Sequence, residues 1–284
     1  MSRLARLRMD SGEWDASEGV FHVRDPHALT QAAGYLKYVS RATGPVFFRG
    51  QDKLYPTLYP SLHRGINSTS GLKNRENTFS VFLKDAQTSG SFIRGTAEYA
   101  HAPILQHYGI RTKWLDLVDN IWIALWFACH IAKPLGAHAQ YLHFERRKRP
   151  YPDTGTPAYA YILLVGAGVV EPVKNCPGLY TGTQAEVIDL RVAAPSMYLR
   201  PHAQHGTLLR RRNADDYTSY NMQPLILGVI RVEIGDALNW LGVGDLLSIH
   251  TLFPPPHYDY GYRQLLTQIP TSAQRLGSIH HVGA

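Results

Sequence analysis

Three segments in the first half of the chain carry apolar residues at the three- and four-residue spacing of an amphipathic helix: residues 25–43, 68–87 and 98–109. Pro26 stands in the first turn of the first segment, a position that proline favours. A fourth segment, residues 120–132, contains no Asp, Glu, Lys or Arg. This composition predicts a helix that is buried on every side, with Asp119 or Asn120 as its N-cap.

The second half of the chain alternates short apolar runs with turn residues, a pattern typical of strands. The longest run covers residues 158–170, and the later ones read "EVIDLRV", "GTLLRR", "LILGVIRVEI" and "LLSIHTLF". One further short strand, residues 45–49, is expected among the helices. We therefore predict an α+β fold in which a helical N-terminal half packs on a central, mostly antiparallel sheet.

The chain length of 284 residues is enough for one large domain. We expect residues 1–24 to be an N-terminal extension and residues 25–284 to form a single domain. Residues 134–157 are polar and contain several prolines, which predicts a long surface loop within that domain rather than a boundary. The basic run at residues 146–149 favours a solvated loop over a nucleic-acid contact.

Charge and cysteine content narrow the class of protein. The formal net charge is +7, from 29 Lys and Arg against 22 Asp and Glu, which favours polyanionic partners such as nucleic acid or nucleotides. Cys129 and Cys176 form neither a disulfide framework nor a metal-ligand pattern, which fits a reducing, cytoplasmic compartment. No apolar run is long enough to span a bilayer, so we expect a soluble protein without a membrane partner.

The short strand at residues 45–49 ends on Arg49, which Gly50 and Gln51 follow at once. One interpretation is a turn with a solvated charge. The other is a guanidinium held at the lip of a cleft, where its planar fork can make two charge-assisted hydrogen bonds to a phosphate group. In the second interpretation, Gly50 lets a ligand approach the backbone closely.

Two further clusters of polar and aromatic residues are candidates for a site. The first, in "QHYGIRTKWLD", contains Gln106, His107, Tyr108, Thr112 and Asp116. The second, in "RPHAQHG", contains Arg200, His202, Gln204 and His205. The histidines lack an acidic companion at zinc spacing, and no P-loop, dinucleotide G-x-G-x-x-G motif or nucleophile elbow is present. We therefore expect no metal site.

Five segments together resemble the FRG domain, a bacterial family named after its Phe-Arg-Gly signature. In chain order they read "FFRGQ", "YPSLHRG", "ILQHYGIRTKWLDLVDNIWIALWFA", "YLRPHAQHGTL" and "LFPPPHYDYG", and they span roughly residues 45–262. The chain departs from the family at "RTKWLDL", where the family usually has Pro-Thr-Arg-Leu-Leu-Asp-Trp. Lys113 keeps a basic side chain there but cannot make a bidentate guanidinium contact.

The order of these segments is similar to that of the ADP-ribosyltransferase group, which implies roles for particular residues. Arg49 would hold the diphosphate of NAD, and His107 and Tyr108 would frame the nicotinamide. Thr112 and Asp116 would order the site, and Gln204, on a late strand, would hold the nicotinamide ribose. The expected catalytic residues are Arg49, His107, Asp116 and Gln204, and the expected NAD-binding residues are Arg49, Gly50, Gln51, Ser61, Arg64, His107, Tyr108 and Thr112.

A glutamine cannot act as a general base, so the base would have to come from elsewhere. Glu76, Asp116 and Glu186 are the candidates. Structural interpretations stand beside these roles. Arg49 could pair with Asp116, Asp116 could cap a helix, His107 and Tyr108 could belong to the edge of the core, and Gln204 could satisfy a buried strand end.

Two hypotheses remain open from the sequence. The first is an enzyme that transfers ADP-ribose from NAD to DNA or RNA, as a bacterial toxin or defence effector, with Arg210, Arg211 and Arg212 as contacts to the nucleic acid. The second is a non-catalytic module that binds a nucleotide or nucleic acid in the same cleft. Salt-dependent binding to DNA or RNA without NAD turnover would favour the module.

Overall fold

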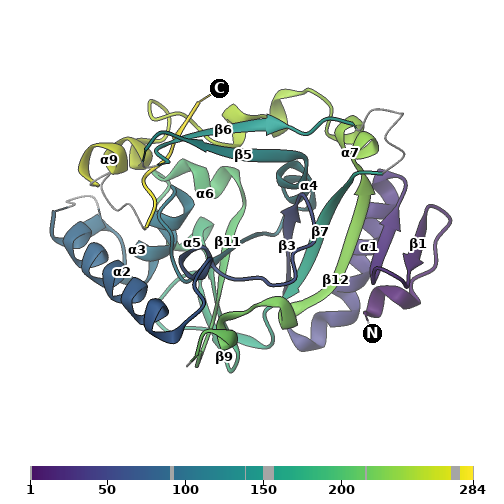
Figure 1. The fold of residues 1–284 in the computed structure, drawn as a ribbon, viewed down its shortest axis with the longest axis horizontal. Coiled ribbons are helices and arrows are strands. Elements are labelled where there is room, and N and C mark those ends of the chain that lie inside the picture. Colours follow the sequence, from purple (N-terminus) through teal and green to yellow (C-terminus); the bar gives the residue numbers. More distant parts are fainter. Residues whose placement is uncertain are drawn as a thin grey trace.

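A ten-stranded sheet runs through the molecule, with its strands in the order β1-β2-β12-β7-β3-β4-β11-β10-β9-β8 (Figure 1). The computed structural model describes residues 2–89, 93–137, 139–149, 157–214, 216–269 and 276–283. The strands are β1 (Gly12–Asp15), β2 (Val20–Val23), β3 (Val46–Gln51), β4 (Leu115–Val118), β7 (Tyr159–Gly166), β8 (Val170–Pro172), β9 (Leu179–Gly182), β10 (Ala185–Asp189), β11 (Gly206–Arg211) and β12 (Ile226–Glu233). Neighbouring strands are antiparallel except β2 and β12, which confirms a mixed fold with a mostly antiparallel sheet.

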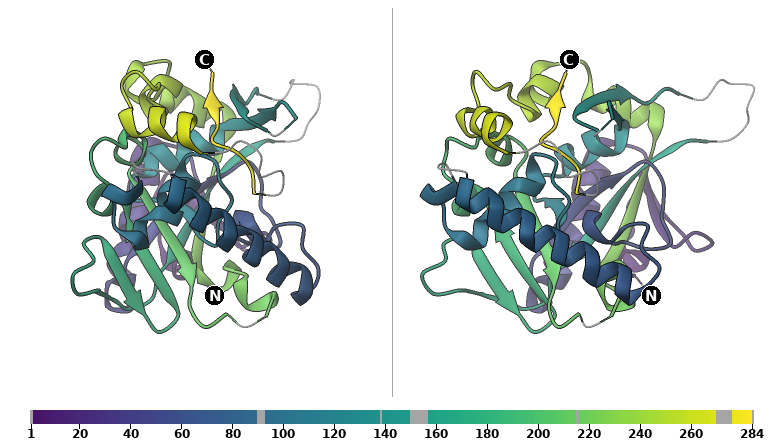
Figure 2. Two further views of the ribbon diagram at one scale, coloured as in Figure 1. Left: turned by 90° about the vertical axis from the view of Figure 1, so that its left-hand side faces the viewer. Right: turned by 60° about the vertical axis from the view of Figure 1, so that its left-hand side comes forward.

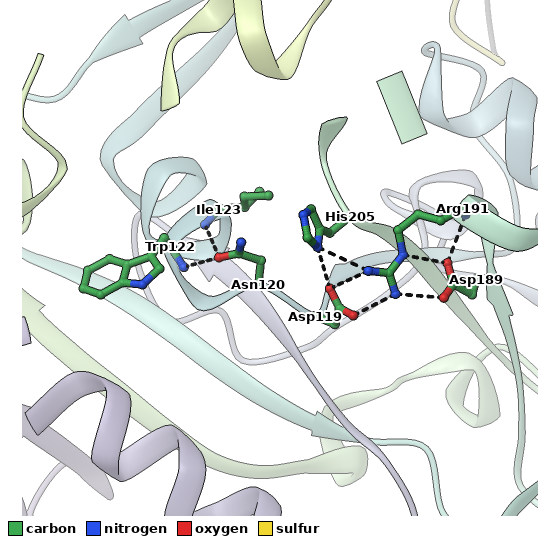
Figure 3. A network of polar contacts seen from close by, with 7 residues as sticks. All are labelled: Asp119, Asn120, Trp122, Ile123, Asp189, Arg191 and His205. Atoms are coloured by element: carbon green, nitrogen blue, oxygen red, sulfur yellow. Dashed lines mark hydrogen bonds and ion pairs between the residues drawn. The ribbon is translucent and has the colours of Figure 1, made fainter. Parts of the chain in front are cut away.

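The four helices expected in the first half are confirmed, with small shifts at their ends. The α-helices are α1 (Pro26–Ser40), α2 (Thr69–Ser89), α3 (Glu98–His107), α4 (Ile121–Cys129), α5 (Leu190–Ala193), α6 (Leu199–Ala203), α7 (Ile234–Leu241), α8 (Ile249–Leu252) and α9 (Tyr260–Gln268). Short 3-10 turns cover Arg3–Arg6, Arg41–Thr43, Ser61–His63, Ile93–Gly95, Thr218–Tyr220, Gln223–Leu225 and Asp245–Leu247. Asn120 caps α4, because its side chain accepts hydrogen bonds from the backbone N–H groups of Trp122 and Ile123 (Figure 3).

A second, three-stranded sheet is formed by β5 (His130–Leu135), β6 (Tyr141–Arg146) and β13 (His281–Val282). Strands β5 and β6 cross the top of Figure 1, above β3 and α4. The sequence interpretation is wrong here, because α4 ends at Cys129 and the expected loop 134–157 contains most of this hairpin. Residues 138 and 150–156 lie outside the described part. The hairpin is mostly exposed and therefore has no apolar alternation to reveal it.

The first 24 residues take part in the fold rather than extending from it. Strand β2 pairs with β12 in parallel, and Leu4 and Phe21 are fully buried in the same core cluster as α1 and α4. The run "LLSIHTLF" is also not a strand. It contributes to the turn Asp245–Leu247 and to helix α8, from which Leu247 and Leu252 pack against the core while Leu246 remains exposed.

Three core clusters surround the sheet. One contains residues of α1, α4 and several strands, and a second contains residues of α2, α3, α5 and α9. Figure 2 shows α2 running along the side that faces the viewer, with α9 and the C-terminal strand above it. The third cluster includes Leu115 and Leu117 of β4, so Asp116 and Val118 project to the opposite face of that strand. None of the helices in the described ranges is both long enough and apolar enough to cross a bilayer.

Candidate functional site

Two cavities, of about 600 and 300 Å³, open on either side of the end of β3. We call them the larger lobe and the smaller lobe. They share the lining residues Arg49, Gly50, Phe127, His130 and Ala132. Because these five residues line both cavities, the two lobes adjoin along a shared wall that includes Arg49, and we treat them as one cleft.

The cleft opens where β3 and β4 separate. Within the described residues, these strands pair at a single position, Phe48 opposite Val118. Arg49 and Asp116, one and two residues beyond that pair, both line the smaller lobe. The guanidinium of Arg49 bridges the separated strands, because its Nη1 donates a hydrogen bond of 2.6 Å to the backbone carbonyl of Asp116. The tertiary structure therefore fixes Arg49 at the lip of a cleft, as one interpretation of the sequence expected.

Arg49 carries a positive charge in the cleft wall and one buried donor that the described residues leave unpaired. Its side chain is half-buried, and its Nε is buried without a partner among the described residues. Burial, followed by the charge of Arg64, lowers the pKa of Arg49 to about 10, so the guanidinium remains protonated at neutral pH. A cation with an unused donor in a cleft is suited to an anionic ligand.

Gly50 has a different role from the one that the sequence suggested. A Cβ at this position would lie 1.9 Å from the carbonyl oxygen of Ala124 and 2.7 Å from the amide nitrogen of Ala128. The close approach that requires a glycine here is that of α4, while Gly50 also lines both lobes. The Phe-Arg-Gly sequence thus packs β3 against α4 and presents Arg49 at the place where they meet.

The smaller lobe collects buried polar atoms that lack partners. Besides Arg49 Nε, these atoms are Gln106 Nε2 and His107 Nε2. Buried polar groups are almost always hydrogen-bonded in folded proteins, so three such atoms in residues that line one cavity indicate a binding site. His107 reaches this position because Gly206 has no side chain: a Cβ there would lie 2.5 Å from His107 Nε2.

Asp116 supplies a carboxylate to this lobe. Its side chain is 48 % exposed, and His107 Nδ1 lies 3.6 Å from its Oδ1. Burial would raise the pKa of Asp116, but contact with His107 and the charge of Arg49 outweigh it and hold the pKa below its usual value. The carboxylate is therefore ionised at neutral pH. Because Asp116 belongs to β4, the alternative in which it caps a helix is wrong.

Gln204 also lines the smaller lobe, although not from a strand as expected. It follows α6 in the turn that leads into β11. Its Nε2 donates a 2.7 Å hydrogen bond to the carbonyl of Leu252, the last residue of α8. The amide nitrogen therefore satisfies a buried helix end. The sequence had suggested that Gln204 could satisfy a buried strand end, and the structure shows a helix end instead.

A network of charged residues holds the strands that carry these side chains (Figure 3). Asp119, directly after β4, accepts hydrogen bonds from both terminal nitrogens of Arg191, at 3.2 and 2.7 Å. Arg191 also pairs with Asp189 at the end of β10, and His205 Nδ1 lies 3.1 Å from Asp119 Oδ1. The network therefore ties the end of β4 to α5 and to the turn after Gln204, which positions the smaller lobe.

Residues 44–135 match the family model of the FRG domain. This match confirms the FRG resemblance for the segment that contributes β3, α3, β4 and α4, and therefore most of the cleft wall. The two motifs beyond residue 135, which contribute Gln204 and Phe253 to the wall, lie outside the matched span, as do the lining residues Phe144 and Tyr217. No curated protein and no solved structure matches this chain.

The larger lobe receives two other residues that the sequence predicted for the site, Gln51 and Arg64. Arg64 Nε donates a hydrogen bond of 3.1 Å to the carbonyl of Tyr59. The rings of Tyr59 and Tyr217 stack at a centroid distance of 4.5 Å, and both line this lobe. The lobe thus combines arginines with aromatic surface, as a nucleotide requires.

Three predicted binding residues, Ser61, Tyr108 and Thr112, are absent from the described cleft wall. Tyr108 is fully buried and donates a 2.6 Å hydrogen bond to Asp259, so it cannot frame a ligand. Its ring packs in the second core cluster, as the core-edge interpretation expected. Thr112 is also fully buried and donates to Gln106 Oε1, while Ser61 accepts a hydrogen bond from the Thr112 amide. Thr112 therefore holds the wall residue Gln106 in place without lining the cleft itself, and Ser61 holds Thr112.

Two of the three candidate bases lie outside the described cleft wall. Glu76 contacts Lys113 at 3.1 Å and His63 at 3.3 Å, and Glu186 pairs with Arg210. Only Asp116 of the three lines the cleft. Charge compensation explains the other two, because each carboxylate neutralises a neighbouring cation.

His130 is a cleft residue that sequence reasoning missed. It lines both lobes, and its ring stacks on Trp126 at a centroid distance of 4.0 Å. The sequence places it inside an apolar run, where it reads as part of a buried helix. No local signal marks the change from α4 to β5, so only the tertiary structure identifies His130.

The three arginines proposed for nucleic acid are held by contacts within the protein. Arg210 pairs with Glu186, and its guanidinium lies 4.7 Å from the centre of the Trp114 ring. Arg212 donates to the carbonyl of Gly182, and Arg211 donates to that of Ser219. All three, with Lys113, Asn213 and Tyr220, line a separate hollow of about 280 Å³.

Proposed function

We propose that the cleft binds NAD and that the protein transfers ADP-ribose from NAD to a nucleic acid. The observation that carries this proposal is that the two lobes adjoin along a shared wall that contains Arg49. NAD consists of two nucleosides joined by a diphosphate. A two-lobed cleft with a cation in the shared wall suits a ligand of this shape and charge.

The larger lobe would bind the adenosine half of NAD. Arg64 adds a second positive charge there, and Tyr59 and Tyr217 supply aromatic surface for a base. Burial and then the charge of Arg64 lower the pKa of Arg49, and a diphosphate between the two guanidinium groups would relieve the repulsion between them. Binding in this orientation places the nicotinamide ribose in the smaller lobe.

The smaller lobe would stabilise the transition state of glycosidic bond cleavage. As the bond between C1′ of the ribose and the nicotinamide nitrogen breaks, nicotinamide leaves as a neutral molecule and positive charge develops on the ribose. The ionised carboxylate of Asp116, partly withdrawn from water, favours that charge. Gln204 lines the same lobe and would contact the ribose through its amide oxygen, since its nitrogen is bound to Leu252.

A nucleic-acid acceptor is favoured by the net charge of +7 and by the hollow that contains Arg210, Arg211 and Arg212. The segment 217–220 joins this hollow to the cleft, because Tyr217 lines the larger lobe and Tyr220 lines the hollow. A strand bound at the arginines would therefore pass near the cleft. Consumption of NAD with modification of nucleic acid would suit a cytoplasmic toxin or defence effector.

The test is to incubate the purified protein with NAD labelled in the adenylate half and with DNA, RNA or protein as separate acceptors. We expect nicotinamide release and label on a nucleic acid. Arg49→Ala should abolish both, whereas Arg41→Ala, a change at an exposed arginine that contacts Tyr38, should alter neither. Failure of the wild-type protein to release nicotinamide with every acceptor would refute the proposal.

One observation favours a second candidate function, a non-catalytic nucleotide or nucleic-acid binding module. No glutamate lines either lobe within the described residues, and the Gln204 amide is partly engaged with Leu252. Calorimetric binding of NAD or a nucleic acid without nicotinamide release would support the module. The affinity for nucleic acid should then fall steeply as salt is added.

A further inference from the structure

His130 is held in one protonation form by the end of α4. It is the first residue of β5, and its Nδ1 lies 2.7 Å from the backbone carbonyl of Trp126. A carbonyl oxygen only accepts hydrogen bonds, so Nδ1 must carry the proton. The other ring nitrogen, Nε2, then has a free lone pair in the neutral imidazole. Stacking on Trp126 at 14° fixes the plane of the ring.

The residue that carries this lone pair belongs to the wall shared by both lobes. His130 is half-buried and lines both lobes together with Arg49. Its Nε2 has no hydrogen-bond partner in the part of the chain that the structure describes. An acceptor group that is not used within the protein therefore stands where the two halves of the ligand would join.

Burial, with the charge of Arg146, lowers the pKa of His130 and keeps it neutral. Burial lowers its pKa from the usual 6.5, the hydrogen bond to Trp126 opposes this, and the charge of Arg146 lowers it further. Arg146 lies opposite His130 on β6, Arg49 stands on β3 at the shared wall, and Asp116 on β4 lines the smaller lobe. At neutral pH the imidazole is therefore uncharged and can accept a proton.

The other polar groups of the cleft are less suited to serve both lobes as a base, and His107, the second imidazole, lines only the smaller lobe, where its Nδ1 lies 3.6 Å from Asp116 Oδ1. Asp116 has a lowered pKa, which makes its carboxylate a poor proton acceptor. Asp52, in the larger lobe, already accepts a hydrogen bond of 3.0 Å from the hydroxyl of Tyr55. Gln204 has no basic group. Among the described residues of the cleft, His130 combines a free lone pair with access to both lobes.

We propose that His130 is the general base of the transfer, an inference that rests on the proposed function. As the bond between C1′ and the nicotinamide nitrogen breaks, its electron pair leaves with nicotinamide. A hydroxyl or ring nitrogen of the nucleic acid forms the new bond to C1′, and the proton that it loses passes to Nε2 of His130. The imidazolium then releases this proton to water, which closes the cycle without another reactant.

The test compares wild type with His130→Asn and His130→Phe across pH. The Asn side chain can still donate to the Trp126 carbonyl but offers no base, and Phe preserves the stacking on Trp126. We expect each variant to lose about 100-fold or more in kcat, the usual effect of a general base, while KM for NAD changes less than about threefold. Wild-type kcat should fall as the pH drops below 6.5, and this acid limb should be absent in the variants.

A measurement on the unmodified protein guards against variants that do not fold. Diethyl pyrocarbonate acylates neutral imidazole, so mass spectrometry should find His130 modified, with loss of activity, and NAD should protect it. Circular dichroism of both variants serves as the control for folding.

The outcomes separate the two proposals. Variants that retain kcat within about threefold of wild type, with the acid limb intact, would overturn the role of His130 while the transferase stands. A wild-type protein that releases no nicotinamide would overturn both. Loss of kcat together with NAD-protected acylation supports both.

Discussion

Replacing Gly50 by alanine tests whether this glycine serves α4 or a ligand. The added Cβ would lie 1.9 Å from the Ala124 carbonyl oxygen and 2.7 Å from the Ala128 amide nitrogen. These are backbone atoms in the middle and last turns of α4, so they cannot rotate away as the end of a side chain can. Either β3 or α4 must move, and Arg49, the adjacent residue, moves with β3.

The magnitude follows from the cost of overpacking. Inserting one extra methyl group into a packed core costs about 1–3 kcal/mol, and we take the upper value, about 3 kcal/mol, because the obstacle is backbone. Restricting the unfolded chain offsets about 0.5 kcal/mol of this. The free energy of unfolding should therefore fall by about 2.5 kcal/mol. For a chain of this size that corresponds to a loss of about 5 °C in Tm.

Gly34→Ala is the matched control. Gly34 lies within α1 and is exposed, and a Cβ added there would meet no described atom outside its own helix within 4 Å. The same substitution there should raise the free energy of unfolding by about 0.5–1 kcal/mol, because alanine favours a helix. Urea unfolding followed by tryptophan fluorescence measures both variants. A Gly50→Ala variant as stable as wild type but with weakened NAD binding would refute our interpretation and restore the ligand role.

Three further results are expected. Arg49→Lys should weaken NAD binding by about tenfold, because an ammonium group keeps the charge but lacks the planar fork of a guanidinium. Calorimetry measures the affinity, and an unchanged affinity would argue against a bidentate contact. Tyr108→Phe removes a hydrogen-bond donor from the buried carboxylate of Asp259 and should lower the free energy of unfolding by about 1.5–3 kcal/mol. The KM for NAD should stay unchanged, and a raised KM would place Tyr108 in the site. Burial lowers the pKa of both His63 and His280 from 6.5 to about 4, so the unfolded chain binds protons more readily. Stability should hold above pH 6.5 and fall between pH 6.5 and 4, and urea titrations should show a smaller fall in His63→Gln.

The cleft residues that could be predicted from sequence share a local signal. Arg49 breaks the apolar pattern at a strand end, and His107 and Asp116 fall in a dense polar cluster beside an apolar helix. Both signals concern a few consecutive residues. Tyr108 and Thr112 share the cluster but point into the core, because neighbours along a chain need not project to the same side. Sequence spacing therefore identified the segment of the site but not the orientation of each side chain.

His130 illustrates what local pattern cannot supply. An apolar run that continues past Cys129 predicts a longer helix, and nothing in the run marks the start of β5. The chain leaves the helix there because β5 pairs with β6 and β6 places Phe144 against Trp126. Such pairing joins residues that are separated along the chain, so a pattern read from a few consecutive residues cannot reveal it.

From the sequence alone came the four main helices, the mixed α and β class with a mostly antiparallel sheet, and the FRG segment. These follow from hydrophobic periodicity, capping residues and the order of short motifs, all of which are properties of short stretches. Only the tertiary structure decided that the first 24 residues join the sheet, that Gly50 faces α4, and that Arg49, Asp116 and His130 share one cleft. The physical reason is that long-range packing determines which side chains meet and which atoms remain without partners.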